Sequence, residues 1–273
     1  MTIAPSRHPH LEGLARKLAE AWQSASQIEG PTAEELPEDR AQAYFIQDRM
    51  AAHLGLPLSG WKVGATSARM RELDGHDDVI PGRIFQPVTF LGATQQLPVE
   101  RFPHARAETE FAFRLQQDCP LRAAPWTVEE LANQVVLHPA IEIIGNRHTL
   151  PNGTQAQRSL MTIADNGGGI GFVFGDACPD WQSIDFRHHR IRLRVDQQPE
   201  AENFLGDLRG EPLQALADLL NHLSGRSIPL HAGDFVSTGA ATVPQPIQAG
   251  SVVQADFGTI GSITLNFTSG ASS

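Results

Sequence analysis

The chain has 273 residues, which allows one large domain with a sizeable core. Its hydrophobic fraction of 41% and charged fraction of 19% are ordinary for a globular protein, and a net charge of −10 with scattered Lys and Arg argues against a nucleic-acid partner. No segment approaches the length of a membrane span, and the first ten residues lack the apolar core of a signal peptide. We therefore expect a cytoplasmic protein with no membrane partner.

Apolar residues recur at helical spacing in two N-terminal segments. The first runs from Leu11 to Trp22 and the second from Ala43 to Leu54, with Gly30-Pro31 between them. We predict a helical N-terminal arm over residues 1–58 and a β-rich catalytic domain over residues 59–273. The arm is too short to bury a core alone, so it should pack on the body or on another subunit.

The body alternates strand patterns with a few helices. Residues 60–67 predict a strand leading into a turn, and residues 69–78 predict a polar loop. A helix is expected from Thr127 to Leu137, beginning with a capping box, and another from Leu213 to Leu223. The arginines of the alternating segment 190–195 predict a solvated strand face, and three further strands are expected after residue 232.

Two acidic segments, 106–115 and 139–147, have the period of two that predicts strands. Glu108 and Glu110 share one face of the first, and Glu142 lies opposite isoleucines in the second. Carboxylates about 4 Å apart repel by roughly 4 kcal/mol at an effective dielectric constant near 20, so a cluster of three needs protons or a cation. An all-oxygen site favours Mg²⁺, then Mn²⁺ or Ca²⁺. The alternative is the solvent face of an ordinary amphipathic strand.

A glycine-rich segment follows the second acidic strand. Asp165 and Asn166 precede Gly167-Gly-Gly-Ile-Gly171, where glycines permit close approach of the backbone to another strand or to a ligand. No Gly-Lys-Ser/Thr follows, and no GxGxxG pattern opens a helix, so this is not a nucleotide-binding loop.

Six motifs in this order resemble the 2-keto-4-pentenoate hydratase branch of the fumarylacetoacetate hydrolase superfamily. They are Gly60-Trp-Lys-Val-Gly-Ala-Thr-Ser67, Arg106-Ala-Glu-Thr-Glu-Phe-Ala-Phe113, Pro139-Ala-Ile-Glu-Ile-Ile144, Ala164-Asp-Asn166, Ala232-Gly-Asp234 and the segment 257–262. The resemblance covers about residues 40–267. The superfamily supports hydration, decarboxylation and C–C hydrolysis on one scaffold. The resemblance therefore identifies the superfamily more sharply than the reaction.

The resemblance implies an α+β fold: a mixed β-roll like the C-terminal domain of fumarylacetoacetate hydrolases, with peripheral helices. It implies one Mg²⁺ or Mn²⁺ held by Glu108, Glu110 and Glu142. The ligand would be a small 2-oxo acid or its enol, chelating the metal through its carboxylate and 2-oxygen. It also implies a homo-oligomer, which could pair with a paralogous decarboxylase.

The same resemblance assigns roles to further residues. Lys62 is a candidate acid/base catalyst. We expect its pKa to be lowered, because it would lie in a desolvated pocket beside a metal. The alternative is an exposed lysine at a strand end. Asp165 is a second catalytic candidate and Asn166 a candidate substrate ligand, although Asx-Gly sequences also make turns. Ser237 and Thr238 occupy the place where the superfamily binds the substrate carboxylate.

The chain departs from the hydratase pattern at one important position. Ile80 stands where that branch usually carries an acid that is a candidate for handling the attacking water, and Asp77 or Asp78 could substitute from the loop. Glycines replace the serine-rich segment after Asn166. His76 lies where the hydrolase branch has a lid histidine, but a lone loop histidine is usually solvated. Arg106 either pairs with the acidic cluster or faces solvent.

We therefore expect a metal-dependent lyase that hydrates a 2-hydroxypenta-2,4-dienoate-type substrate to a 4-hydroxy-2-oxo acid in aromatic-compound catabolism. The resemblance implies a metal-stabilised enolate as the intermediate. One alternative is a 2-oxo acid decarboxylase or an acylpyruvate-type C–C hydrolase on the same site. Another is a non-catalytic paralogue that binds a 2-oxo acid or serves as a partner subunit.

Overall fold

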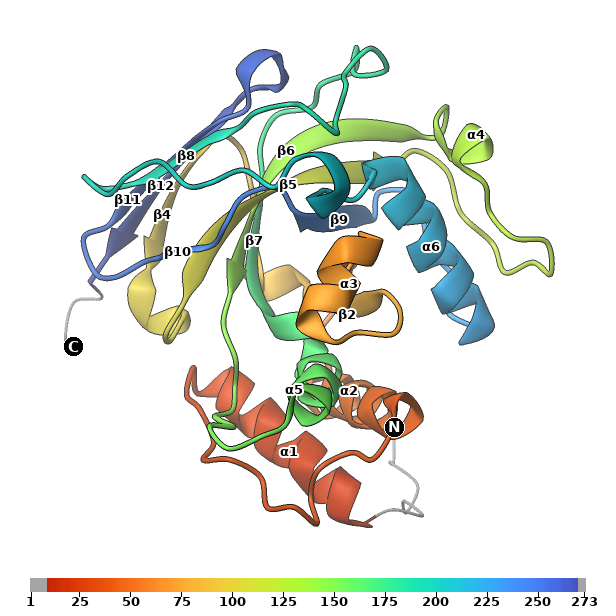
Figure 1. Cartoon of the computed structure of the whole chain (residues 1–273), viewed down its shortest axis with the longest axis vertical. Coiled ribbons are helices and arrows are strands. Elements are labelled where there is room, and N and C mark those ends of the chain that lie inside the picture. Colours follow the sequence, from red (N-terminus) through yellow and green to blue (C-terminus); the bar gives the residue numbers. More distant parts are fainter. Residues whose placement is uncertain (1–8, 270–273) are drawn as a thin grey trace.

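The computed structural model describes residues 9–269. The sequence predicts a frayed tail from Thr268, but Thr268 is the last residue of a strand. Residues 1–8 and 270–273 lie outside the described part. Two β-sheets and surrounding helices form the body (Figure 1), which confirms the predicted α+β fold with mixed strand pairing. Among residues 9–269, none of the helices combines the length and apolarity that crossing a bilayer requires.

The larger sheet has eight strands in the order β2-β1-β9-β5-β6-β7-β3, with β10 added to β5. They are β1 (Leu58–Gly64), β2 (Ile80–Phe85), β3 (Thr89–Leu91), β5 (Arg106–Leu115), β6 (Val135–Ile144), β7 (Gly169–Phe174), β9 (Phe235–Ala240) and β10 (Gln245–Pro246). The smaller sheet has the order β4-β12-β11-β8. Its strands are β4 (Thr94–Pro98), β8 (Arg192–Val195), β11 (Val252–Asp256) and β12 (Ser262–Thr268).

Alternation along β5 gives the larger sheet two different faces. Phe111 and Phe113 enter the main core, which the sheet shares with the smaller sheet and with α6 (Pro212–Gly225). Ala112 belongs to a separate small apolar cluster with Phe174 and Phe235. Because side chains of a strand alternate between faces, Glu108 and Glu110 lie on the same face as Ala112. We call this the inner face.

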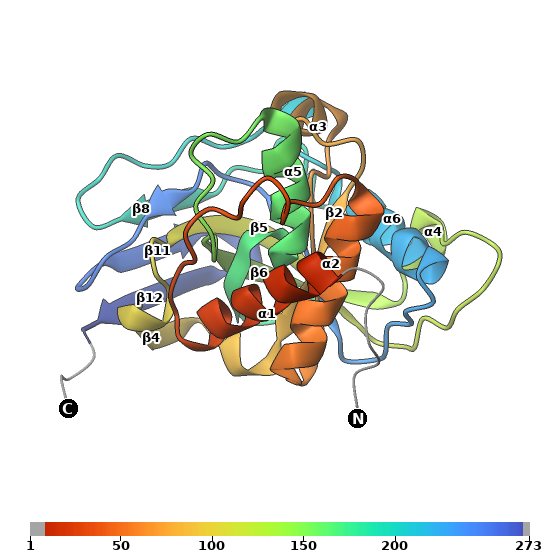
Figure 2. The same ribbon diagram turned by 90° about the horizontal axis from the view of Figure 1, so that it is seen from below.

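The N-terminal arm packs on the body of its own chain. Helices α1 (Pro9–Gln23) and α2 (Arg40–Leu54) contact each other and, with α5 (Gln155–Ala164), lie below the larger sheet in Figure 1 and in front of it in Figure 2. Their leucines share a core with Ile80 and Met161. The buried Gln47 amide donates to two body carbonyl oxygens, each at 2.9 Å. The predicted domain boundary and the homo-oligomer stay predictions.

One predicted helix is much shorter than expected. The capping box of Thr127 and Glu130 is present, but α4 spans only Val128–Leu131. The prediction of a helix to Leu137 is wrong because β6 begins at Val135, which pairs with Leu115. Val135, which continues the helical pattern of apolar residues, is a β-branched residue of the strand. Pairing of β6 with the long neighbouring strand β5 overrides the weak local preference for a helix.

Two helices occur that the sequence analysis did not predict, one of them in the predicted loop over residues 69–78. Helix α5 begins with a capping box of Thr154 and Gln157, a signal that the sequence contained. Helix α3 (Ala68–Asp74) is capped by the Ser67 hydroxyl and ends at Gly75, whose φ is 73°. None of its side chains is buried, so it has no apolar periodicity that could have predicted it.

Candidate functional site

The three predicted metal ligands meet on the inner face of the larger sheet. Strands β5 and β6 are antiparallel, and their register places Glu108 directly opposite Glu142. Candidate ligand oxygens of Glu108, Glu110 and Glu142 all lie within 4.8 Å of one another. Their exposed fractions are 7%, 1% and 0%, respectively. The alternative of an ordinary solvent-facing strand is therefore wrong.

The hydrogen-bond partners differ among the three carboxylates. Glu110 Oε2 accepts hydrogen bonds from the Ser237 hydroxyl and from the Gly239 N–H, the latter at 3.0 Å. Glu142 accepts no hydrogen bond from the described residues, and Lys62 Nζ lies 3.4 Å from its Oε1. A buried carboxylate without donors is costly, so the Glu142 oxygens fit the role of cation ligands.

Burial and mutual repulsion disfavour ionisation of this cluster. Burial, reinforced by the charge on Glu110, raises the pKa of Glu108 to about 8. Burial also raises the pKa of Glu142 well above its usual value. A divalent cation would stabilise the ionised carboxylates that burial disfavours, and a set of carboxylate oxygens suits a hard ion.

Lys62 lies on β1 beside the acidic cluster. It is 7% exposed, and its Nζ donates a hydrogen bond to the Gly167 carbonyl oxygen at 2.9 Å. Burial alone would lower the pKa of Lys62, but the charges of the three glutamates outweigh burial and raise it. The predicted lowering concerned a pocket with a bound metal, whose charge would offset that of the glutamates, and it stays a prediction.

The turn that holds Lys62 requires glycine. Gly167 has a φ of 71°, and a Cβ there would lie 3.2 Å from Lys62 Cδ. On the adjacent strand β2, a Cβ at Gly82 would lie 2.3 Å from the Asn166 carbonyl oxygen. The glycine-rich segment therefore serves a close approach between this turn and two strands, which is one of the two purposes that the sequence predicts.

Asp165 and Asn166 anchor this turn and do not line the cavity described below. Asp165 Oδ2 accepts a hydrogen bond from the Arg147 N–H at 2.6 Å, and His148 Nε2 lies 3.8 Å away. Burial raises the pKa of Asp165 to about 7. The Asn166 amide pairs with the N–H and the carbonyl oxygen of Arg83, at 2.7 and 2.8 Å. The catalytic role of Asp165 and the substrate-binding role of Asn166 stay predictions.

Ser237 and Thr238 are consecutive on β9 and therefore point to opposite faces. Ser237 is fully buried, and its hydroxyl donates to Glu110. The Thr238 hydroxyl donates to the Phe111 carbonyl oxygen at 2.7 Å. Ser237 thus orients a candidate metal ligand, whereas Thr238 links two strands. The predicted contact of each with substrate stays a prediction.

A cavity of about 350 Å³ opens onto this cluster, a volume in the range of small-molecule sites. Its charged lining residues are Lys62, Asp74, Arg106, Glu108 and Glu110. Its apolar lining residues are Ala65, Met70, Phe204, Leu208, Ala240 and Pro244. Arg106, whose orientation the sequence left open, lines the same cavity as the glutamates and is itself exposed to solvent.

The sequence analysis missed Met70 and Asp74, which bring α3 to the cavity. Ile80 is 2% exposed and packs in the core of the N-terminal arm. Asp77 and Asp78, the suggested substitutes for an acid at position 80, are exposed and are not among the cavity lining residues. Asp74 of α3, which is also exposed, is the acid that this helix adds to the cavity lining.

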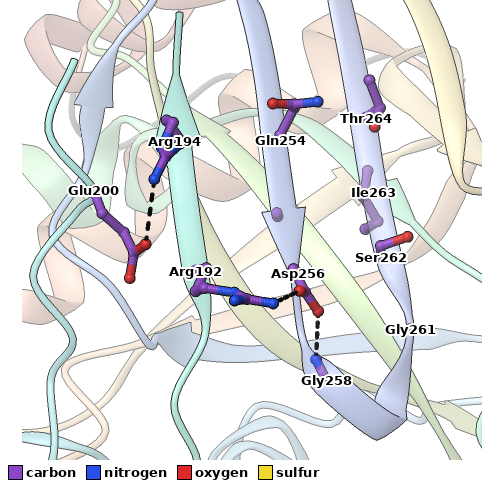
Figure 3. A pocket seen from close by; sticks show the side chains of 11 residues that line it. Arg192, Arg194, Glu200, Gln254, Asp256, Gly258, Gly261, Ser262, Ile263 and Thr264 are labelled. Carbon is purple, nitrogen blue, oxygen red and sulfur yellow. Dashed lines mark hydrogen bonds and ion pairs between the residues drawn. The ribbon is translucent and has the colours of Figure 1, made fainter. Parts of the chain in front are cut away.

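A second hollow, of about 590 Å³, lies on the smaller sheet and not beside the glutamates. Figure 3 shows that Arg192 pairs with Asp256 and that Arg194 points toward Glu200, 3.8 Å away. These side chains are exposed, which confirms the predicted solvated strand face. The charges of Arg192 and Arg194 in this hollow are thus already paired with acids of the same chain.

No family model matches the chain. Individual relatives nevertheless match it over nearly its whole length. A 2-oxo-hept-4-ene-1,7-dioate hydratase from Escherichia coli is 27% identical over 267 residues, covering 96% of this chain and 98% of the relative. A 2-keto-4-pentenoate hydratase from Paraburkholderia phymatum is 30% identical over 264 residues, covering 94% and 97%.

The fold also matches a solved structure. A 4-oxalocrotonate decarboxylase from Pseudomonas putida G7, complexed with magnesium and adipate, superposes with a TM-score of 0.81 at 21% sequence identity. The match covers 97% of this chain and all of the decarboxylase chain. At this identity the likeness establishes the fold, and the reaction has to be argued from the site and from the sequence relatives.

Proposed function

Because the chain belongs to the family of 2-keto-4-pentenoate hydratases and is a hydro-lyase of that type, we propose that it hydrates a 2-hydroxypenta-2,4-dienoate-type substrate to a 4-hydroxy-2-oxo acid. The relatives support a step of aromatic-compound catabolism. The observation that carries the proposal is the buried cluster of Glu108, Glu110 and Glu142, with Lys62 beside it at one wall of a small cavity.

The cluster fits a divalent cation. Its donors are carboxylate oxygens, and neither oxygen of Glu142 accepts a hydrogen bond within residues 9–269. Solved neighbours of the same fold are complexed with magnesium, calcium or manganese, which supports a divalent metal at this site. We propose Mg²⁺ or Mn²⁺, held by Glu108, Glu110 and Glu142. When bound, such an ion acts as a Lewis acid toward the 2-oxygen of a 2-oxo acid.

The remaining residues position groups and move protons. Ser237 and Gly239 fix Glu110 through hydrogen bonds to its Oε2. Lys62 Nζ is held by the Gly167 carbonyl oxygen and transfers a proton between its amine and the carbon skeleton of the substrate. The apolar wall with Met70, Phe204 and Leu208 accommodates the hydrocarbon part of a small 2-oxo acid.

The test is one incubation with two protein samples. Wild-type protein and the Glu108→Gln variant, each with Mg²⁺ or Mn²⁺, receive fresh 2-hydroxypenta-2,4-dienoate, and the products are read by mass spectrometry. We expect the wild type alone to add one water. Absorbance would not suffice, because ketonisation of the dienol without hydration also removes the signal.

Other outcomes point to the alternatives. Loss of carbon dioxide from a 2-oxo diacid would identify a decarboxylase, and cleavage of an acylpyruvate would identify a C–C hydrolase. Binding of metal and oxalate with no turnover of any of these substrates would identify a 2-oxo-acid-binding paralogue.

A further inference from the structure

Water addition needs a group that takes a proton from the attacking water, and the cavity offers few choices. Of its five charged lining residues, Glu108 and Glu110 belong to the cation cluster. The Lys62 ammonium already donates to a carbonyl oxygen. An arginine such as Arg106 does not accept protons in proteins. The Asp74 carboxylate is the one acid of this lining outside the cluster.

The geometry of α3 directs Asp74 toward the cavity. Met70 and Asp74 are four residues apart and therefore share one face of the helix. Both line the cavity, and Asp74 is also exposed to solvent, whereas the Leu73 side chain between them is 50% exposed and is not among the lining residues. The helix is held from both ends: the Ser67 hydroxyl donates to the Leu208 carbonyl oxygen at 3.2 Å, and the Gln155 amide donates to that of Leu73 at 3.0 Å.

His76, two residues after α3, ties this end of the helix to α5. It is partly buried, and its Nδ1 lies 2.5 Å from the Ser159 hydroxyl oxygen. Burial lowers the pKa of His76. The contact with α5 helps to hold the end of α3 that carries Asp74.

We propose that Asp74 is the catalytic base that takes a proton from the water adding to C4 of the 2-oxo-3-enoate form of the substrate. This role rests on the proposed hydratase function. An electron pair of the water oxygen forms the C4–O bond, and the C3=C4 π electrons move toward the 2-oxo group. The water O–H bond breaks, and its proton passes to an Asp74 oxygen. Lys62 delivers one proton to C3, Asp74 releases one to solvent and Lys62 takes one from solvent, so one water is added in total.

The experiment separates water addition from enolisation. Asp74→Asn is compared with Asp77→Asn, a matched control, because Asp77 is an exposed acid near α3 that is not among the cavity lining residues. For each protein three quantities are measured: the kcat of dienoate hydration, the rate at which the C3 hydrogens of 2-oxopentanoate exchange with D₂O by NMR, and the calorimetric Mg²⁺ affinity. The exchange requires enolisation but no attack by water.

We expect Asp74→Asn to lower hydration by about 10²- to 10⁴-fold, as loss of a general base does. Exchange and Mg²⁺ affinity should match the wild type, and Asp77→Asn should match it in all three. Hydration by Asp74→Asn at the wild-type rate would overturn the role, and so would an equal fall in exchange. A wild type that exchanges hydrogens but adds no water would overturn the proposed function, and the role of Asp74 with it.

Discussion

Of the two hollows described above, the larger one has the lining that is less suited to binding a ligand. The larger, on the smaller sheet, is lined by exposed charges that already have partners, such as Arg192 with Asp256. The smaller opens onto buried glutamates, and Glu142 accepts no hydrogen bond from the described residues, although Lys62 Nζ lies 3.4 Å from its Oε1. Solvent screens exposed pairs, so they have little binding energy to offer, whereas buried oxygens that accept no hydrogen bond are costly until a ligand satisfies them. Buried oxygens that accept no hydrogen bond identify the site better than the volume of the hollow does.

Removing the buried charges should produce the largest effect. We expect the double variant Glu108→Gln, Glu110→Gln to lose Mg²⁺ affinity by more than about 100-fold, because even outer-shell partners of a metal are worth about 10- to 100-fold. Calorimetry and metal analysis would measure this. Glu129→Gln, an exposed residue of α4, is the control. Unchanged metal content in the double variant would refute the ligand assignment.

A second test asks whether the glycine turn serves Lys62 in particular. Alanine at Gly167 or at Gly55 must adopt a left-handed conformation, at a cost of about 1–2 kcal/mol in each case. Only at Gly167 does the new Cβ approach the lysine, whereas Gly55 has open space. We expect similar losses of unfolding free energy, but a fall in kcat of up to about 100-fold only for Gly167→Ala. Equal kcat values would show that the turn does not position Lys62.

The buried Asp165 should leave a signature in the pH dependence of stability. Burial raises its pKa from 3.8 to about 7 in the folded state, so the folded protein holds a proton that the unfolded chain releases. The free energy of unfolding should therefore fall as pH rises from about 4 to about 7, with a slope on the order of 1.4 kcal/mol for each step of one in pH. Asp165→Asn should flatten this dependence in urea unfolding measured across that range. An unaltered slope would place the titration elsewhere.

The smallest effect is expected in the larger hollow. The Arg194–Glu200 pair spans 3.8 Å between side chains that are 57% and 40% exposed. Arg194→Gln should change the free energy of unfolding by less than about 0.5 kcal/mol and leave hydration unchanged. A clear loss of activity would mean that charge pairing does not distinguish the two hollows.

Local periodicity predicted the faces of the acidic residues, and the resemblance to the hydratase branch identified the three of them as one metal site. The alternation around Glu108, Glu110 and Glu142 sets which face each side chain occupies, and the pairing of β5 with β6 then brings them together. The N-terminal helices and α6 were predictable for the same reason, because each has an apolar stripe at helical spacing.

Features that depend on distant contacts were not predictable in this way. Gly167 and Lys62 are far apart in the chain, and nothing in either segment alone shows that they form a hydrogen bond. The end of α4 was missed because pairing of β6 with β5 overrides local helix preference. Asp74 was missed because a helix with no buried side chain leaves no hydrophobic pattern in the sequence.

The lack of buried side chains in α3 has a consequence for divergence within the family. Substitutions on this helix alter the wall of the cavity without removing any side chain from either core cluster. Surface changes of this kind usually cost little stability, so selection can explore them with few compensating mutations. The range of accepted substrates can therefore evolve at the positions of α3 other than Asp74, while the glutamates and the sheet that carries them stay fixed.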